Sequence, residues 1–532
     1  MSHEATLLHE LPLTSAARAP DAIALHDGPR RVSYAELADD VRRFASGLAA
    51  LGARRGDRIA IFLDKRVETV VASFGAPAAG AVFVPINPLL KADQVGYILR
   101  DCAVRVLVTS ADRLRSLAPA LADCPDLHHV VVLGTPGTDI ASPVPVHGWA
   151  ALLDAPSKAG QRVIDNDVVG ILYTSGSTGK PKGVVLSHRN MVAGAKSVAS
   201  YLENRSDDVL LAALPLSFDA GFSQLTTAFH AGAGVVLLNY LLPKDVVKAI
   251  ESHRVTGLTA VPPLWIQLTQ VSWSDAARGA LRYFANTGGR MPLETLKSLR
   301  ALMPAASPFL MYGLTEAFRA TYLPPSEVDR RPDSIGKAIP NSEILVLRPD
   351  GTSCEPGEPG ELVQRGALVA QGYWNDPERT AERFKPLPGQ LPGVILPEMA
   401  VFSGDTVRRD EEGFLYFIGR RDEMIKSSGY RISPNEVEEV LYATQMVGEC
   451  AAFGLPHASL GEEVAVVVTP REGAELDVAR LLAACRERLP AYMVPARVDT
   501  REGPLPRNAN GKIDRKALAE AARAGLVAGA AR

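Results

Sequence analysis

The chain has few cysteines, little net charge and no long hydrophobic run, and each of these absences excludes a class of protein. Its five cysteines among 532 residues are scattered, and no two of them stand in C-x-x-C spacing. They predict free thiols in a reducing compartment, with neither a disulfide framework nor a zinc site. A net charge of −3 gives no electrostatic reason to expect a nucleic-acid or anionic membrane partner.

Targeting and dinucleotide-binding signals are missing as well. The N-terminus lacks the positive start and apolar stretch of a signal peptide, and no segment is long and apolar enough to predict a transmembrane helix. We therefore expect a cytoplasmic protein. The fragment Gly232-Ala233-Gly234 lacks the third glycine of G-x-G-x-x-G, which argues against a dinucleotide-binding fold.

The length and the hydrophobic pattern indicate more than one domain. A chain of 532 residues exceeds one ordinary core. Short β-branched runs alternate with amphipathic helices up to about residue 323, which predicts parallel sheets covered on both faces. A Pro- and Gly-rich stretch at 324–360 indicates a small β-barrel or sheet, and a capping box from Ser433 to Glu436 opens a compact α+β unit. We predict an α/β protein with doubly wound sheets and a small β-barrel in residues 1–419, followed by a smaller α+β domain in residues 420–532.

The stretch 173–183 is rich in groups that bind polyphosphate. Glycines let backbone N–H groups converge on one anion, and hydroxyls and lysines add donors and charge. It is not a Walker A loop, because Gly179-Lys180 is followed by Pro181 and then by a β-branched run rather than a helix. We predict a loop between two strands that closes over the phosphates of ATP; the alternative is a solvated hairpin. The candidate phosphate-binding residues are Thr174, Ser175, Gly176, Ser177, Thr178, Gly179, Lys180 and Lys182.

A second polar cluster, Tyr312-Gly313-Leu314-Thr315-Glu316, follows an apolar strand. Side chains at such a position lie at the carboxyl edge of a sheet, where open α/β folds bind ligands. Tyr312 can stack on a purine, and Thr315 can donate to a phosphate. Glu316 can hold Mg²⁺ together with phosphate oxygens.

Further along the chain, three segments carry isolated polar residues. Asp405 follows Phe402-Ser403-Gly404 and can accept hydrogen bonds from both ribose hydroxyls, although alone it could be a turn aspartate. Arg420 follows Gly419, and Gly429 lies in a Ser- and Gly-containing loop. Lys512 follows an Asn-Gly turn, where a tight loop holds it out from the domain.

Taken in order, these segments resemble the motifs of the adenylate-forming superfamily, which includes acyl-CoA synthetases, amino-acid adenylation domains of nonribosomal peptide synthetases, and firefly luciferase. The likeness covers residues 10 to 520 approximately and extends to bacterial stand-alone AMP-forming ligases, among them exosortase-associated acyl-CoA ligases. It implies a ligase that uses ATP and Mg²⁺ to convert a carboxylic acid to an acyl-AMP with release of pyrophosphate. A thiol then takes the acyl group.

The resemblance also implies a role for each motif. The loop and Thr315 hold phosphates, Glu316 holds Mg²⁺, and Asp405 and Arg420 hold the ribose. Lys512 bridges the substrate carboxylate and the α-phosphate, because one ammonium can offset the repulsion between two anions. The mobile C-terminal domain then turns about Asp422, and the loop of Gly429 lines a tunnel for the thiol.

The substrate prediction depends on Asp219. Amino-acid adenylation domains carry Phe-Asp at the position of Phe218-Asp219, and their aspartate pairs with the α-ammonium; a desolvated carboxylate needs such a partner. We expect an amino acid. The alternative is that Asp219 caps the next helix and that the chain is an acyl-CoA synthetase for an aliphatic or aryl acid. By the same likeness, the substrate pocket is lined by Asp219, Ala220, Ser223, Ala260, Asn286, Gly288, Met311, Arg319 and Ala320.

Arg319 is unusual in this predicted pocket. It can pair with an acidic or otherwise polar group of the substrate, or it can bridge to a surface carboxylate of the protein. The thiol acceptor is expected to be coenzyme A or the phosphopantetheine of a carrier protein. We expect any carrier to be a separate protein, since no carrier module follows Lys516. A luciferase-like monooxygenase is a further possibility, whereas a regulatory protein without catalysis should lack Lys512 or Glu316, and both are present.

Overall fold

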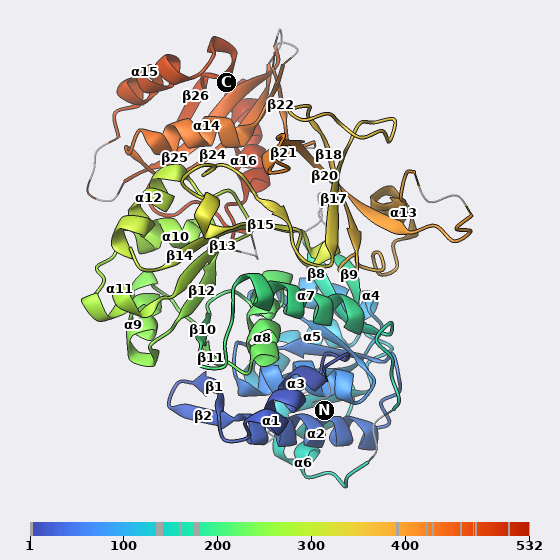
Figure 1. Ribbon diagram of the computed structural model, residues 1–532. Coiled ribbons are helices and arrows are strands. Elements are labelled where there is room, and N and C mark those ends of the chain that lie inside the picture. The colour runs from blue at the N-terminus through green and yellow to red at the C-terminus, as the bar shows by residue number, and fades with distance from the viewer. Residues whose placement is uncertain are drawn as a thin grey trace.

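The structure is a computed structural model that describes residues 4–134, 142–158, 161–174, 181–389, 393–421, 423–427, 430–457, 460–471, 473, 476–508 and 511–530. Within these ranges the strands form four sheets. Two large sheets build the N-terminal part, an antiparallel sheet lies beside them, and a fourth sheet belongs to the C-terminal part (Figure 1). The mixed α/β architecture predicted from the sequence is confirmed.

The two large sheets are mostly parallel, as the alternation of strands and helices predicts. In the nine-stranded sheet only β2, β15 and β16 run antiparallel to their neighbours. In spatial order its strands are β16 (Lys337–Ala338), β15 (Thr321–Leu323), β14 (Ser307–Tyr312), β13 (Tyr283–Asn286), β12 (Gly257–Ala260), β10 (Val209–Ala212), β11 (Gly234–Leu237), β1 (Ile23–Asp27) and β2 (Arg30–Ser33). The seven-stranded sheet has the order β7 (Val146–Gly148), β6 (His129–Leu133), β5 (Val104–Ser110), β3 (Arg58–Phe62), β4 (Val82–Pro85), β8 (Val168–Thr174) and β9 (Lys182–Ser187).

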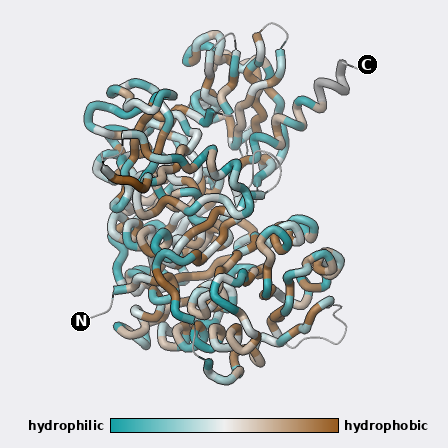
Figure 2. Tube along the Cα trace, turned by 90° about the vertical axis from the view of Figure 1, so that its right-hand side faces the viewer, coloured by the Kyte–Doolittle hydropathy of each residue, from teal (hydrophilic) through white to brown (hydrophobic). Residues whose placement is uncertain are grey.

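Helices cover both faces of each large sheet. A layer formed by α2, α3, α7 and α8 shares one hydrophobic core with both sheets. The outer faces are covered by α9 to α12 on the nine-stranded sheet and by α4 and α5 on the seven-stranded sheet. In Figure 2 apolar segments accordingly run through the interior, and polar residues lie on the outer helices. The helices of the N-terminal part are α1 (Glu10–Arg18), α2 (Tyr34–Ala50), α3 (Val67–Ala78), α4 (Ala92–Asp101), α5 (Ala111–Leu121), α6 (Trp149–Leu153), α7 (His188–Tyr201), α8 (Asp219–Ala231), α9 (Pro243–His253), α10 (Pro262–Leu268), α11 (Asp275–Ala280), α12 (Leu293–Leu302) and α13 (Pro377–Arg383), with short 3₁₀ turns η1 (Thr315–Ala317) and η2 (Pro325–Glu327).

The helix starts follow the local sequence in the N-terminal part but not at Ser433. At the start of α2, the side chains of Ser33 and Glu36 form a capping box. Ser433 stands at the N-cap of α14 (Pro434–Ala443), yet its side chain makes no cap hydrogen bond, so the predicted second capping box is wrong. Its expected partner Glu436 is exposed, and Arg290 lies within electrostatic range of the Glu436 carboxyl.

The antiparallel sheet occupies the region predicted to be a small β-barrel. As far as the chain is described, its strands form an open path with one branch rather than a closed ring of pairs. The order is β17 (Ser342–Leu347), β18 (Gly360–Gly366), β20 (Met399–Arg409) and β19 (Phe384–Pro386), with β21 (Leu415–Arg420) paired to β20. In the β20–β21 hairpin Asp405 lies directly opposite Arg420, so the hairpin presents both predicted ribose ligands together.

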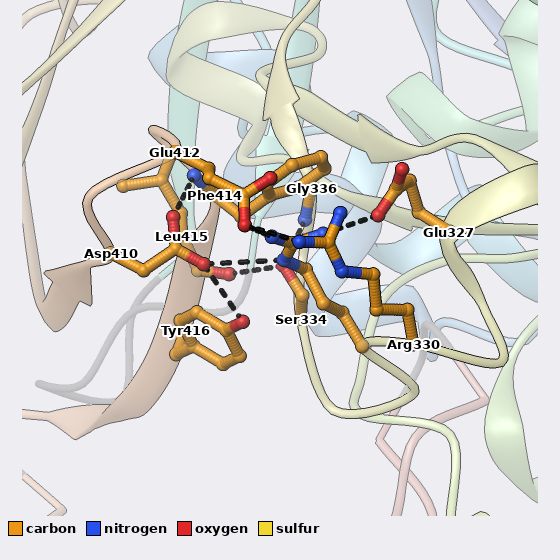
Figure 3. A network of polar contacts seen from close by, with 10 residues as sticks. Glu327, Arg330, Ser334, Gly336, Asp410, Glu412, Phe414, Leu415 and Tyr416 are labelled. Carbon is orange, nitrogen blue, oxygen red and sulfur yellow. Dashed lines mark hydrogen bonds and ion pairs between the residues drawn. The ribbon is translucent and has the colours of Figure 1, made fainter.

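A polar network fastens this hairpin to the segment that follows η2 (Figure 3). Arg331 pairs with Glu327 of η2 and with Asp410 and Glu412 of the hairpin turn. Ser334 Oγ donates to the carbonyl of Leu415 at 2.8 Å. The network thereby joins the hairpin to η2 and to the segment that leads from η2 to β16.

The C-terminal part is a compact α+β unit, as predicted. Its strands are β23 (Tyr430–Ile432), β22 (Ile425–Ser427), β25 (Gly461–Pro470), β24 (Val447–His457) and β26 (Arg497–Thr500), and its helices are α14, α15 (Val478–Arg488) and α16 (Arg515–Ala530), with the 3₁₀ turn η3 (Ala491–Met493). It contacts the N-terminal part through Glu439, which accepts from the backbone N–H of Leu293 at 3.0 Å, and through Gln445, which donates to Glu294 at 2.9 Å.

The prediction that the cysteines are free thiols agrees with the structure. All five are buried free thiols. In the described ranges no helix combines the length and the apolar character needed to cross a bilayer.

Candidate active site

The predicted motifs converge where β14 ends. Gly313 follows the last residue of β14, Tyr312, and η1 then presents Thr315 and Glu316. Backbone contacts bring the antiparallel sheet to the same place, because the N–H of Ala370 donates to the carbonyl of Glu316 at 2.8 Å. Segments from both large sheets, the antiparallel sheet and the C-terminal part thus surround one location.

At one end of this site lies Asp405, which is 7% exposed. The Tyr312 hydroxyl donates to its Oδ2 at 2.5 Å, whereas its Oδ1 is buried without a hydrogen-bond partner, with Arg420 Nε 3.9 Å away. Burial raises the pKa of the Asp405 carboxyl, and Arg420 opposes that shift. A buried carboxylate oxygen without a donor is costly in a completed core and suits a ligand that brings hydroxyl groups.

The next group is formed by Lys182, Glu316 and Tyr373. The Tyr373 hydroxyl donates to Glu316 Oε1 at 2.6 Å and accepts from Lys182 Nζ at 3.1 Å, which leaves the lysine 3.8 Å from the carboxylate. Burial lowers the pKa of the Lys182 ammonium, and Glu316 opposes that shift. Thr174 ends the preceding strand with a buried hydroxyl that has no partner. The other candidate phosphate residues, 175 to 180, lie outside the described residues.

The donor set around Glu316 suits a hard cation of the magnesium type. The described part of the chain holds no group of three or more histidine, cysteine or acidic side chains that could form a complete metal cage. Mg²⁺ is commonly held by one or two carboxylates together with substrate phosphates. Glu316 next to the phosphate-binding strands fits that arrangement.

Lys512 enters the site from the C-terminal part. It packs on Gly288, where an added Cβ would lie 2.9 Å from Lys512 Cε and 3.5 Å from its Nζ. Gly288 has a φ of +76°, so this position after β13 favours glycine both for its backbone and for the close approach of the lysine. Burial lowers the pKa of the Lys512 ammonium, while Asp219 and Asp405 favour its charged form. Lys512 therefore lies within electrostatic reach of both aspartates.

Asp219 is engaged by the protein itself. Its Oδ2 accepts from Arg319 Nη1 at 2.9 Å, and its Oδ1 accepts from the Thr315 hydroxyl at 3.0 Å. The N-cap of α8 is Phe218, and no side chain caps that helix, so the capping alternative for Asp219 is wrong. Of the two fates considered for Arg319, pairing with a protein carboxylate is the one observed, although both partners are interior rather than at the surface.

Beside this pair lies a small cavity of about 20 Å³, enough for one water-sized group. Four of the predicted pocket residues line it, namely Ala220, Ser223, Met311 and Arg319. The other lining residues were not predicted; they come from α7, α8 and neighbouring strands and are Val198, Leu202, Leu210, Gln224, Thr227, Gly257, Thr259 and Tyr283.

The remaining predicted residues lie around the cavity or outside the described chain. Ala260, Asn286 and Ala320 are buried near it without lining it. Asn286 donates to the carbonyl of Gly289 at 2.8 Å, which orients the turn that receives Lys512. The predicted hinge Asp422 and the tunnel residue Gly429 are not among the described residues.

The sequence analysis did not predict Tyr373, Gln224 or Thr227 as residues of the site. Tyr373 gives no local signal, because its partners Glu316 and Lys182 are far away in the chain. Gln224 and Thr227 did leave a signal: they are polar residues three positions apart on a mostly apolar helix, which places them on one face.

Comparison with known protein families identifies the class of protein. Residues 13–374 match the model of the AMP-binding enzyme family, and residues 436–512 match that of the AMP-binding enzyme C-terminal domain. The chain therefore belongs to the AMP-binding enzyme family, that of the AMP-forming acid–thiol ligases, which confirms the resemblance to the adenylate-forming superfamily.

Individual relatives fall in two groups. A feruloyl-CoA synthase from an Amycolatopsis species is 32% identical over 509 residues, covering 94% of this chain and 96% of that protein. An L-proline–[L-prolyl-carrier protein] ligase from Pseudomonas fluorescens is 32% identical over 526 residues, covering 96% of this chain and 99% of the other. Among solved structures, ATP-bound MatB from Rhodopseudomonas palustris is similar with a TM-score of 0.85 at 27% identity, covering 97% of this chain and 99% of that one. The o-succinylbenzoate coenzyme A synthetase of Bacillus subtilis, solved with ATP and a magnesium ion, has a TM-score of 0.79 at 28% identity and covers 95% of this chain and 98% of its own.

Proposed function

We propose that this ligase activates a carboxylic acid that has no α-ammonium group and transfers the acyl group to a phosphopantetheine thiol, that of coenzyme A or of a separate carrier protein. The observation that carries the substrate part is the buried ion pair between Asp219 and Arg319. The proposal thus takes the alternative to the amino acid expected from the sequence.

The argument concerns charge. Both oxygens of Asp219 already accept hydrogen bonds, and its negative charge is offset by a guanidinium 2.9 Å away. A substrate ammonium would have to displace Arg319 or be buried beside it, and either arrangement leaves an uncompensated positive charge in a desolvated pocket. An acid without the ammonium leaves the pair intact.

The roles of the residues at the nucleotide end of the site are proposed in the same way, from which of their polar atoms and charges have partners in the protein. We assign the ribose hydroxyls to Asp405, whose free oxygen needs donors, with Arg420 beside it. Thr174 and Lys182 face the phosphates from the two strands that flank the loop, and Thr315 faces them from η1, although its hydroxyl is shared with Asp219. Glu316 would hold Mg²⁺, which when bound neutralises charge that develops on the phosphates.

Lys512 supports the first half-reaction. The substrate carboxylate must approach the α-phosphate, and the two anions repel each other. An ammonium held on Gly288, within reach of Asp219 and Asp405, can attract both anions and stabilise the charge at the α-phosphate as pyrophosphate leaves. The reaction yields the acyl-AMP.

For the second half-reaction, we propose that Lys512 withdraws as the C-terminal part turns about Asp422. The loop of Gly429 then borders the path by which the thiol reaches the acyl-AMP. The thiol sulfur forms the thioester as the acyl–phosphate bond breaks, and AMP leaves. Such an exchange keeps water from the acyl-AMP while two chemistries use one site.

The test is acid-dependent exchange between ATP and pyrophosphate, run with amino acids and their des-amino analogues. We expect exchange with the des-amino acids and little with the amino acids. Exchange confined to amine-bearing acids, and lost in Asp219→Ala, would overturn the substrate proposal. Thioester formation with coenzyme A and with an isolated phosphopantetheinylated carrier protein, measured side by side, separates the two acceptors.

A further inference from the structure

One wall of the acyl cavity carries polar atoms that no protein group satisfies. Gln224, Thr227 and Arg319 line the cavity and are 6%, 2% and 2% exposed. Gln224 Oε1, Thr227 Oγ1 and Arg319 Nε are nevertheless buried without a hydrogen-bond partner. Buried polar atoms are paired in most proteins, with protein groups or with water, so three unpaired atoms around one small cavity mark a place for a water molecule or for a polar group of a ligand.

These side chains are held in place by their other contacts. Gln224 Nε2 donates to the carbonyl of Leu211 at 2.7 Å and to that of Thr259 at 3.4 Å, which fixes its Oε1 on the opposite side of the amide. Thr227 lies on the same face of α8, three residues further on. Arg319 is anchored through Nη1 on Asp219. The unpaired atoms therefore form a fixed set rather than a mobile one.

The set defines the chemistry of the missing group. It offers one acceptor, one donor and one hydroxyl that can act as either, and it carries no net charge because Asp219 neutralises Arg319. A carboxylate would face the Gln224 oxygen, and an ammonium would face the guanidinium. A neutral group that both donates and accepts satisfies the set.

The other lining side chains are largely apolar. Val198, Leu202, Leu210 and Met311 contribute aliphatic surface to the same cavity. We propose that the acid activated by this enzyme carries a neutral hydrogen-bonding group, a hydroxyl or a primary amide, on an otherwise apolar acyl chain, and that Gln224, Thr227 and Arg319 bind this group. The inference rests on the proposed function, since it concerns the acyl pocket of that reaction.

The test uses stable mimics of the acyl-AMP, so that binding is measured without turnover. Acylsulfamoyl adenosines are prepared with four-, six- and eight-carbon acyl chains that end in methyl, hydroxyl, primary amide, carboxylate or ammonium. Calorimetric titration gives their dissociation constants. At one chain length at least, we expect the hydroxyl or amide analogue to bind about ten-fold more tightly than the methyl analogue. We expect both charged analogues to bind more weakly than the methyl analogue, and comparison of hydroxyl with amide identifies the group.

A pair of matched variants connects the preference to the cavity wall. Thr227→Val removes one hydroxyl at nearly constant volume and should reduce the preference several-fold. Thr226→Val is the control, because Thr226 is equally buried on α8, bonds to the carbonyl of Ser223 and does not line the cavity. Thermal unfolding midpoints show that both variants fold.

Two outcomes would overturn the inference alone, and a third would overturn the proposed function as well. Equal binding of methyl, hydroxyl and amide analogues at every length would overturn it, as would a preference that is the same in wild type and Thr227→Val. In both cases acid-dependent pyrophosphate exchange would leave the proposed function standing. Absence of binding by all analogues, together with absence of exchange, would instead overturn the proposed function and the inference with it.

Discussion

Two aspartates of the candidate active site, Asp405 and Asp219, differ in how many of their oxygens the protein pairs. Asp405 keeps one oxygen without a donor, whereas both oxygens of Asp219 accept hydrogen bonds from the protein. A carboxylate that lacks a hydrogen-bond donor suits a ligand that brings one. A carboxylate whose oxygens and charge are both paired within the protein forms a neutral part of the pocket wall. On our proposal, the same amino acid favours a hydroxyl-bearing ligand at one end and disfavours a cationic ligand at the other.

The largest effect is expected at Lys512, which lies within electrostatic reach of both aspartates. Lys512→Ala should lower the rate of acid-dependent pyrophosphate exchange about 100- to 1000-fold, because the ammonium no longer offsets the repulsion between carboxylate and phosphate. Its removal should cost little stability, since burial disfavours the ammonium and lowers its pKa. Lys516→Ala, at an exposed position of α16, is the matched control.

The lowered pKa also gives Lys512 a pH signature. Because we propose that Lys512 acts as an ammonium, exchange should decline as the pH rises through a pKa below the ordinary 10.5. Exchange in Lys512→Ala that stays within about three-fold of wild type would remove Lys512 from the first half-reaction.

A second prediction compares the effects of the two aspartates on the stability of the fold. Asp219→Asn leaves the buried Arg319 guanidinium without a counter-charge and should lower the free energy of unfolding by about 3–5 kcal/mol. Asp405→Asn should cost little or even stabilise, because burial already favours the neutral form of that carboxyl. Urea unfolding of the two variants measures the difference.

A double variant sharpens the same comparison. Asp219→Asn combined with Arg319→Met removes both charges and should regain most of the lost stability. If Asp219→Asn and Asp405→Asn lower the free energy of unfolding equally, the protein does not distinguish the paired carboxylate of Asp219 from the partly unpaired carboxylate of Asp405.

Nucleotide binding provides the third comparison. Asp405→Asn should raise the KM for ATP about 10- to 100-fold, since a charged acceptor of the ribose hydroxyls becomes a weaker neutral one. Asp219→Asn should leave that KM within about three-fold of the wild-type value, provided that the variant folds. Steady-state exchange with ATP varied at saturating acid gives both numbers.

The raised pKa of Asp405 adds a pH dependence with a defined sign. Its protonated form is favoured in the folded protein, so its contribution to stability is complete below pH 3.8 and is lost as the pH rises through the raised pKa. Asp405→Asn lacks this loss. The stability of the variant relative to wild type should therefore increase with pH across that pKa, and a constant difference would contradict the assignment.

The smallest effect is expected at a third carboxylate, Glu316, whose Oε1 accepts from Tyr373 at 2.6 Å. Tyr373→Phe removes that donor and the acceptor of Lys182, so the carboxylate should be held less firmly. We expect the Mg²⁺ concentration for half-maximal exchange to change about 3- to 10-fold. Tyr34→Phe is the control, because Tyr34 is a buried tyrosine that donates to the Ala233 carbonyl in the core. Equal Mg²⁺ dependence in wild type and Tyr373→Phe would show that Tyr373 does not position Glu316.

The order of the strands and motifs could be predicted because the signals are local. Alternating apolar runs predicted the parallel sheets, and local sequence also sets the start of α2, where Ser33 and Glu36 form a capping box. The same signal failed at Ser433, whose side chain makes no cap hydrogen bond, while Arg290 of another part of the chain lies within electrostatic range of Glu436. A local pattern predicts a local hydrogen bond only when no distant residue competes for the side chain.

Pairings across the site could not be predicted. Asp219 and Arg319 are one hundred residues apart, and so a phenylalanine–aspartate pair that signals amine binding in relatives does not reveal that its carboxylate is already neutralised. The polar face of α8 was visible in the sequence, but its unpaired atoms became apparent only once the cavity was known.

The sequence by itself determined the fold class, the family and the order of the functional motifs, because period-two and helical apolar patterns and turn residues act over a few neighbouring positions. Only the tertiary structure decided which polar atoms find a hydrogen-bond partner within the protein and which remain unpaired. That outcome depends on burial and on partners brought together from distant segments, since a polar atom is costly only after packing has excluded water from it.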